Sequence, residues 1–438
     1  MEIARFYATM INSQARNPAE AKKNMIKRDL HVHLHGCLSA EDLWHQGKDI
    51  YKNQDKLLHW YAEEYQKAWG RLPDYRQYWE STNGIELLKN DYIFAEANNF
   101  ARFQACFNLI VALCPMSPNS FKVEERIIRK VAKQGLEYFQ ARTLIPIRFN
   151  NKEVELFLCE LCKKVQELNS ELPMQTSLVF CLFRENSLAQ KQYQQLRDFI
   201  KAYPDLGSNI SGIDFAFNEE GAPPKEKVSL FKKFHQDNQT LQKLEILYHV
   251  GESFTDKSLN SAIRWVWEAN ALGATRLGHA IALGVDPKNY AGRRIQELKT
   301  ERLDTINWLI NHHGRLKEHG YHSNLKDLRK EIPFINKWEA DTIPVEADKT
   351  SIEDSRALQV AVAGVLKEEK AFIETCPTSN LRIGQITQPI FHPLKFFHEQ
   401  GLNYTVCTDD PGIFNIDWTT EYEFSQQISK LAESKLKN

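Results

Sequence analysis

Histidines alternate with apolar residues in the segment 28–36, which reads RDLHVHLHG. In a β-strand alternate side chains share a face, so His31 and His33 point to one side and the apolar residues between them to the other. Two imidazoles on one face at the end of a strand are suited to binding a metal ion. The pair alone is a weak indication, because two unrelated histidines would give the same pattern.

Three further segments end in side chains that can bind a metal or transfer a proton. They are YHVGE at 248–252, RLGHA at 276–280 and TDDP at 408–411. A lone buried histidine or aspartate is usually structural. Complementary ligand and acid/base types at four strand ends are hard to explain in that way and instead indicate one shared functional site.

Eight short apolar segments with strand-like composition alternate with helical patterns along the chain. This alternation predicts parallel βαβ units closed into an α/β fold, a (β/α)8 TIM-type barrel, whose strand ends would bring the four segments together. The predicted strands are 29–36, 136–144, 176–183, 210–217, 244–252, 274–281, 371–377 and 404–410. Helices are expected between them, for example over 153–168, 188–203, 258–272 and 353–369.

We interpret residues 1–438 as a single barrel domain with two long insertions. A helical, aromatic insertion at 43–125 follows the first strand, and another at 286–350 follows the sixth. Both leave the carboxyl end of a strand, so both are expected on the C-terminal face of the barrel, where active sites lie. They could form a lid, a substrate wall or a contact between subunits of a homo-oligomer. A surface insertion without such a role is an equal alternative.

As a set, five segments resemble the adenosine deaminase family of metal-dependent hydrolases. They occur in the family's order and span most of the chain: LHVHLHG at 30–36, HVGE at 249–252, LGH at 277–279, ETCPTSN at 374–380 and TDDP at 408–411. The resemblance implies hydrolytic deamination of an adenine nucleoside or nucleotide, of the adenosine-to-inosine type. The implied partner is therefore a small purine molecule.

The resemblance also implies one Zn²⁺ ion per chain. Zinc lowers the pKa of a coordinated water towards neutrality and so provides the hydroxide that adds to C6 of the purine. By the family's pattern the ligands are His31, His33, His249 and Asp409. The fourth strand ends GIDFAFN at 212–218 without the bridging lysine of two-metal relatives, which favours a single ion.

The same pattern implies roles for the remaining polar residues. Glu252 would protonate N1 of the ring, and His279 would orient or deprotonate the water. Asp410 would hydrogen-bond N7, and the backbone at Gly251 would help to seat the base. A neutral purine needs an acid on one side and a nucleophile on the other, so these residue types also fit the chemistry independently.

Two positions depart from the family. His35 stands where an aspartate associated with the ribose hydroxyl is usual, and Phe217 stands at a position that is usually glycine beside the purine. An imidazole at His35 could meet a phosphate, and a phenyl ring at Phe217 would reshape the base pocket. The alternative for both is drift in a site that still accepts adenosine.

The composition excludes several other functions. The chain has 56 Lys+Arg against 57 Asp+Glu, so general nucleic-acid binding is not expected. No apolar stretch is long enough to cross a bilayer, and the N-terminus lacks the apolar region of a secretory signal. Eight cysteines in mostly apolar segments are typical of reduced thiols, which predicts a cytoplasmic protein.

Two alternative functions remain at this point. A single-metal hydrolase of the same fold could act on another purine-like or amide substrate, an alternative that His35 and Phe217 keep open. A weakly active assembly component, for example in a defence system, would use the insertions for contacts. Every catalytic position is filled, which argues against an idle site.

Overall fold

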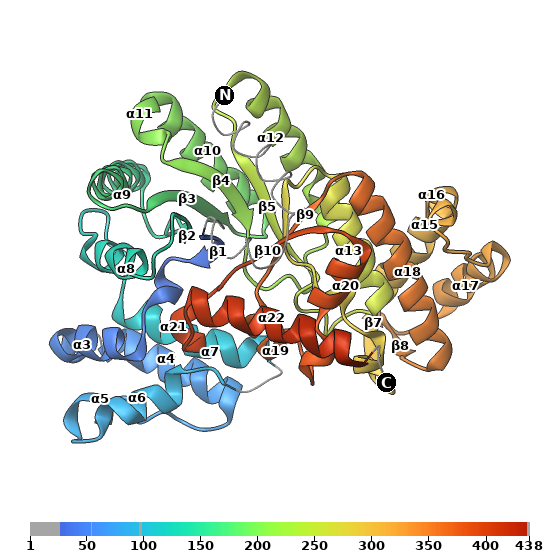
Figure 1. Ribbon diagram of the computed structural model, residues 1–438, viewed down its shortest axis with the longest axis horizontal. Helices are drawn as coiled ribbons and strands as arrows, with labels where there is room; N and C mark the ends of the chain where they lie inside the picture. Colours follow the sequence, from blue (N-terminus) through green and yellow to red (C-terminus); the bar gives the residue numbers. More distant parts are fainter. Residues whose placement is uncertain (1–26, 54, 96–98, 436–438) are drawn as a thin grey trace.

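The computed structural model describes residues 27–53, 55–95 and 99–435. Eight parallel strands form one sheet in the order β1-β2-β3-β4-β5-β6-β9-β10, and helices surround it (Figure 1). These strands are β1 (Arg28–His33), β2 (Tyr138–Leu144), β3 (Gln175–Leu182), β4 (Ile210–Phe215), β5 (Glu245–Val250), β6 (Arg276–His279), β9 (Phe372–Thr375) and β10 (Asn403–Val406). The predicted (β/α)8 barrel is confirmed.

The sheet closes between its first and last strands through the backbone of Asp409. The His33 N–H donates to the Asp409 carbonyl at 2.8 Å, and the Asp409 N–H donates to the His31 carbonyl at 2.9 Å. A parallel bridge between Val32 and Asp409 marks the same closure. The barrel therefore has no open edge at this point.

Seven of the eight barrel strands end earlier than the sequence pattern predicts. At or shortly after the ends of four of them, positive φ angles occur: Phe217 (68°), Gly251 (65°), His279 (62°) and Asp409 (62°). A left-handed residue turns the chain away from the direction of the strand. Non-glycine residues at three of these positions carry backbone strain, which is concentrated at the carboxyl ends of the strands.

Amphipathic helices cover the outside of the barrel, and their apolar faces pack on the alternating strands. The helix at 151–171 shows how such an element starts: Asn150 caps it and accepts from the N–H groups of Lys152 and Glu153. The covering helices are α9 (Asn151–Glu171), α10 (Asn186–Ala202), α11 (Pro204–Gly207), α12 (Val228–Thr240), α13 (Leu259–Ala271), α14 (Ile281–Gly284), α18 (Lys349–Glu368), α19 (Pro377–Arg382), α20 (Pro393–Gln400), α21 (Pro411–Phe414) and α22 (Trp418–Lys435).

The segment 43–125 contains helices, as its composition predicts, and these lie beside the C-terminal end of the barrel (Figure 1). Its aromatic residues mostly pack the helices together: Tyr61, Tyr65 and Tyr78 are fully buried. The helices between β1 and β2 are α3 (Ala40–Ile50), α4 (Asp55–Trp69), α5 (Gln77–Glu80), α6 (Gly84–Tyr92), α7 (Phe100–Leu113) and α8 (Lys122–Ala132).

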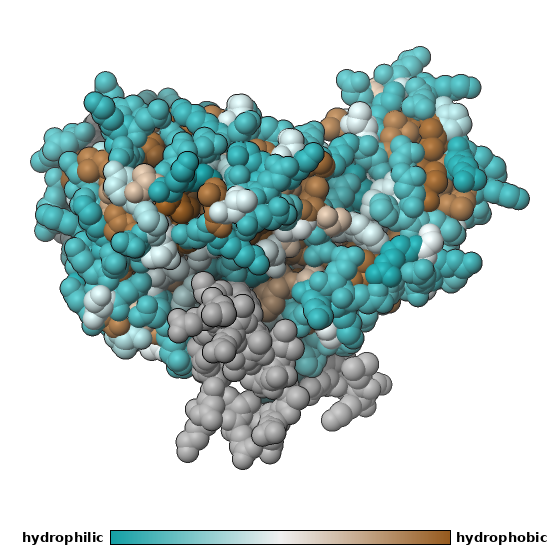
Figure 2. Space-filling model, turned by 90° about the horizontal axis from the view of Figure 1, so that it is seen from above, coloured by the Kyte–Doolittle hydropathy of each residue, from teal (hydrophilic) through white to brown (hydrophobic). Residues whose placement is uncertain are grey.

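The segment 286–350 combines a two-stranded antiparallel sheet with helices. In Figure 2 this part projects from the body of the molecule and carries apolar residues on its visible face. Its elements are β7 (Arg294–Leu298), α15 (Lys299–Asn311), α16 (His313–Glu318), α17 (Leu325–Lys337) and β8 (Thr342–Glu346). Among the helices that the structure describes, none combines the length and apolarity that a bilayer crossing requires.

Candidate active site

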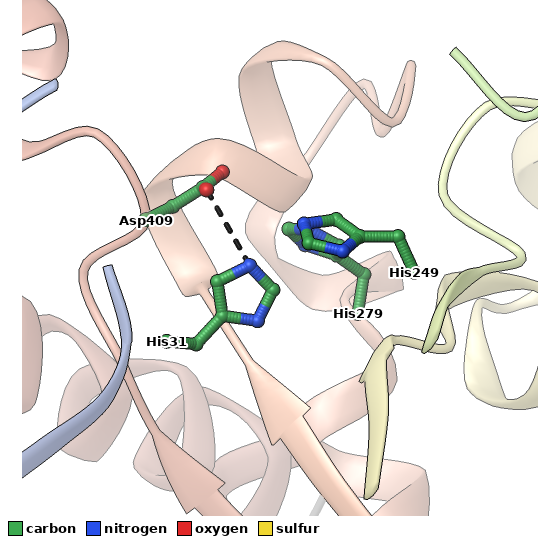
Figure 3. A group of neighbouring side chains, drawn as sticks. All are labelled: His31, His249, His279 and Asp409. Carbon is green, nitrogen blue, oxygen red and sulfur yellow. Dashed lines mark ion pairs between the residues drawn. The ribbon is translucent and has the colours of Figure 1, made fainter. Parts of the chain in front are cut away.

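Four buried side chains from four strand ends converge at the C-terminal end of the barrel. His31, His249, His279 and Asp409 each offer one ligand atom, and these atoms all lie within 4.8 Å of one another. Figure 3 shows Asp409 facing His31, with the rings of His249 and His279 beside them. His31 Nε2 lies 3.5 Å from Asp409 Oδ1.

The donor set fits a divalent metal such as zinc. Nε2 of His31 and of His279 are buried, and neither has a hydrogen-bond partner within the described part of the chain. A buried polar atom without a partner is costly, so two such nitrogens beside a carboxylate indicate a site built for an ion. Imidazole nitrogen and carboxylate oxygen are donors that zinc accepts.

His33 lies at the outer side of this cluster. Its side chain is 21% exposed, and its Nε2 is 3.4 Å from Asp409 Oδ1. It forms a second potential ligand group with Asp409 and Asp410. The structure thus gathers three of the four predicted zinc ligands with His279 and places the fourth next to the shared Asp409; the ligand assignment itself stays a prediction.

Buried carboxylates hold two of the histidines from behind. His31 Nδ1 lies 3.0 Å from Glu374 Oε2, and His249 Nδ1 lies 3.1 Å from Asp214 Oδ1. A carboxylate accepts only from an N–H, so we assign the proton to Nδ1 in both rings. This tautomer directs the Nε2 lone pair towards the centre, as ligation requires.

Two arginines balance the negative charges of these carboxylates. Arg142 on β2 pairs with Asp214 at 3.2 Å and also with Glu374. Arg276 pairs with Glu374 at 3.0 Å. Burial opposes ionisation of both acids, but the arginine charges hold the pKa of Asp214 and of Glu374 well below the usual range. Ionised carboxylates are therefore available to orient the ligand rings.

Glu252 is buried beside the cluster, and its Oε1 lies 3.5 Å from His279 Nε2. Burial, reinforced by the negative charges of Asp409 and Glu219, raises the pKa of Glu252 well above its usual value. This shift favours the protonated form, which a general acid needs.

Glu219 fixes the turn that carries Glu252. One oxygen accepts from the Gly251 N–H at 2.9 Å, and the other accepts from the N–H groups of Glu252 at 2.5 Å and Ser253 at 2.8 Å. Three consecutive amides on one buried carboxylate leave the loop little freedom. The Gly251 N–H is occupied by Glu219, and the predicted contact between the Gly251 backbone and the base stays a prediction.

His279 has a neutral partner instead of a carboxylate. Its Nδ1 lies 2.9 Å from Asn380 Oδ1, and the Asn380 amide nitrogen donates to Thr375 Oγ1 at 3.1 Å, which fixes the orientation of the amide. Burial lowers the pKa of His279 to about 3. The ring is therefore neutral, with its Nδ1–H on Asn380 and a free lone pair on Nε2 facing Glu252.

Asp410 has a buried Oδ1 without a hydrogen-bond partner among the described residues, and it lines the cavity. Burial and the adjacent charge of Asp409 raise the pKa of Asp410 well above its usual value. A Cβ at Gly36 would lie 1.8 Å from this oxygen, so the glycine of the HxHxHG segment makes room for the carboxyl group. A protonated Asp410 can donate to a ring nitrogen.

A cavity of about 290 Å³ leads from the cluster to the surface along α7. His35 and Phe217 both line it. His35 Nε2 lies 3.0 Å from Glu124 Oε1, a contact that the sequence did not predict. Phe217 stacks on Phe183 with ring centroids 4.4 Å apart, and its backbone keeps the left-handed conformation that suits the glycine usual there.

Comparisons with known proteins agree with this geometry. The family model described as adenosine deaminase matches residues 81–326 and 348–438. An adenosine deaminase of Escherichia coli strain SMS-3-5 / SECEC is 32% identical over 77 residues, which are 18% of this chain and 23% of that protein. The chain therefore matches less than a quarter of the length of this curated relative.

Solved structures share the fold at low identity. Arabidopsis ADAL complexed with GMP superimposes with a TM-score of 0.53 at 14% identity, covering 92% of this chain and 86% of that one. An amidohydrolase from Burkholderia ambifaria with bound Zn gives 0.51 at 12% identity, covering 91% and 78%.

Proposed function

Because this chain belongs to the adenosine deaminase family, we propose that it is a metal-dependent hydrolase that deaminates an adenine nucleoside or nucleotide at C6. The observation that carries the proposal is one arrangement of three groups. A protonated Glu252 and a neutral His279 face each other across 3.5 Å, next to a cluster of unpartnered ligand atoms. An acid, a base and a metal site at one point are what hydrolytic deamination needs.

The proposed metal is zinc, one ion per chain. Its proposed ligands are His31, His33, His249 and Asp409. A bound zinc ion would supply hydroxide near neutral pH by lowering the pKa of a coordinated water. The carboxylate partners of His31 and His249 support their assignment as ligands, and the bound zinc in a structural neighbour supports the identity of the metal.

Glu252 serves as the proton donor to the purine. Its raised pKa keeps a proton on a carboxyl group that lines the cavity, where it can be shared with ring nitrogen N1. Protonation at N1 withdraws electron density from C6 and makes that carbon electrophilic. Glu219 holds the Glu252 backbone through three amides, so the acid keeps its position without moving towards the substrate.

His279 and Asp410 complete the proposed machinery. The Nε2 lone pair of His279 can take the proton of the attacking water, because Asn380 holds the opposite nitrogen as the donor. Asp410 donates its proton to N7 and so fixes the orientation of the base. The tetrahedral intermediate then collapses: the C6–N bond breaks, and the amino group takes the proton held by His279 and leaves as ammonia.

The test is product release from a panel of adenine compounds. We expect ammonia, with the matching ultraviolet change, from at least one of adenosine, deoxyadenosine, AMP and ATP, or methylamine from N6-methyl-AMP. Zinc content is measured in the same preparation. A zinc-loaded protein that is silent on every compound would reject the proposal and favour a non-purine substrate or an assembly role.

A cytoplasmic location and a homo-oligomer formed through the insertions remain predictions. All eight cysteines are free and seven are buried, which is compatible with a reducing compartment.

A further inference from the structure

The outer part of the cavity differs in character from the reacting centre. Starting from the proposed function, we infer that this part selects an uncharged adenine nucleoside with an apolar group on its sugar side, in preference to a phosphorylated nucleoside. When the base meets Glu252 and Asp410, the remainder of the substrate lies in the continuation of the cavity along α7.

Apolar side chains form most of this continuation. Phe103, Phe107, Ile110 and Val111 on α7 line one side, and Ile147 after β2 lines the cavity as well. Val111 is 41% exposed and Ile147 is 55% exposed, so the apolar surface continues to the rim. Covering such side chains with an apolar group releases water from both surfaces, which a phosphate cannot do.

The surroundings of His35 also disfavour a phosphate. Glu124 holds the His35 imidazole from behind, with its Oε1 3.0 Å from His35 Nε2, and His35 lines the cavity. His35 is thus committed to a carboxylate, whose charge offsets any positive charge the ring could offer to an anion.

Two arginines line the cavity, but one is buried in ion pairs and the other lies apart from it at the rim. Arg142 is fully buried between Asp214 and Glu374 beneath the ligand rings. Arg148 lies at the exposed end and donates to the carbonyl of Met116. Recognition of a phosphate ordinarily uses several converging donors, which this wall does not provide.

Thr143 offers a neutral polar group to the sugar. Thr143 Oγ1 is buried, lines the cavity and has no hydrogen-bond partner within the described residues. A hydroxyl can satisfy it without introducing charge, and an unsatisfied Thr143 Oγ1 would be costly in a filled site. The wall therefore combines one hydroxyl contact with apolar surface.

The direct test compares 5′-deoxy-5′-methylthioadenosine and its n-butylthio analogue with adenosine and AMP. We expect kcat/KM for the thioethers to exceed that for AMP by at least about 100-fold, since one well-packed alkyl group alone gives about 10- to 200-fold. A higher kcat/KM for AMP than for the thioethers would overturn the inference and leave the proposed deamination intact.

A binding measurement separates failure of the inference from failure of the proposed function. Inosine, 5′-deoxy-5′-methylthioinosine and IMP cannot be deaminated, so calorimetry with the zinc-loaded wild-type protein reports the cavity without turnover. Tighter binding of the thioether than of IMP supports the inference even if no compound is deaminated. Equal or tighter binding of IMP, or no binding of any of the three, would overturn it.

Two variants test the wall itself. Val111→Ser should lower kcat/KM and affinity for the n-butylthio compounds about fivefold. The matched control Val228→Ser, at an exposed valine outside the cavity, should change neither quantity.

Glu124→Gln should raise affinity for IMP at least about threefold, because it keeps a partner for His35 but removes a negative charge. Unchanged values for both Val111→Ser and Glu124→Gln would contradict the assignment of this wall.

Discussion

The inner and outer parts of the cavity differ in the side chains that line them: fixed polar groups at the inner end and mainly apolar groups at the outer end. At the inner end, His31, His249 and His279 each have a side-chain partner on Nδ1, and Arg142 fixes two of those partners. At the outer end, α7 and the residues after β2 offer mainly apolar surface that reaches solvent. Chemistry requires fixed polar groups, whereas the choice of substrate rests on a wall that tolerates change. Substitutions should therefore differ sharply in effect between the two regions.

The largest effect is expected at Glu252. Glu252→Gln keeps the shape of the side chain but removes the proton donor, so kcat should fall about 10²- to 10⁴-fold with every substrate. Zinc content should stay unchanged, because Glu252 is not a proposed ligand. The surface variant Glu226→Gln serves as the control, and near-normal turnover by Glu252→Gln would remove the acid from the mechanism.

The next largest effect is expected on zinc occupancy, when the proposed ligand Asp409 is substituted. Asp409→Asn preserves the size of the side chain and tolerates the left-handed backbone, but it removes the shared carboxylate charge. We expect zinc occupancy, measured by elemental analysis after dialysis, to fall below half, with activity falling in proportion. Full occupancy in this variant would show that Asp409 is not needed to hold the ion.

A smaller loss of zinc affinity is expected when Asp214, which holds the ring of the proposed ligand His249, is substituted. Asp214→Asn leaves His249 a neutral acceptor and leaves Arg142 without one of its two carboxylates. Zinc affinity should fall about 10- to 100-fold, the usual consequence of losing an outer-shell carboxylate. A chelator competition titration would measure this change, and an affinity equal to wild type would mean that the buried carboxylate does not orient the ring.

At the boundary between the two regions, Phe217→Ala should act on binding more than on chemistry. The substitution removes the stack on Phe183 and enlarges the cavity but touches neither a proposed ligand nor the acid. We expect KM to change about three- to tenfold with kcat within about twofold. A collapse of kcat without a change in KM would place this ring in the inner region instead.

The smallest effect on turnover is expected at Glu421, outside both regions. Burial raises the pKa of Glu421 to about 7 from 4.5, so the folded chain retains a proton that the unfolded chain loses first. Its contribution to stability is fully present below pH 4.5 and is lost as the pH rises through 7. Between pH 5 and 8, the free energy of unfolding should fall by about 3 kcal/mol relative to Glu421→Gln, measured by urea denaturation; parallel curves would contradict the raised pKa.

The barrel and its inner site were accessible from sequence because both depend on local patterns. Alternating apolar residues indicate strands, and the residue types at four strand ends indicate ligands and acids. Asp214 lies inside the predicted strand 210–217, and Glu219 follows it by two residues, so each carboxylate beside apolar residues was a usable signal. The roles of these two carboxylates were not predictable, because they depend on contacts with the following segment. Asp214 meets the His249 ring, and Glu219 meets the amides of residues 251–253.

The outer wall was the least predictable part. Glu124 lies in α8, the helix before β2, and is far from His35 in sequence. No sequence spacing therefore predicts the contact between them. Similarly, the left-handed backbone at Phe217 contradicts the local preference of a phenylalanine and is imposed by the surrounding fold. Tertiary packing determines such features, and the substrate contacts follow from them.

The closure of the barrel through Asp409 has a consequence for the order in which the site can form. Its backbone joins the first and last strands, while its side chain meets the histidines of that first strand. No partly folded chain that lacks this junction can hold the proposed ion with full affinity, and a loaded ion would in turn resist separation of the two strands. Metal uptake would thus report completion of folding, and metal loss would weaken the molecule first at the junction between the first and last barrel strands.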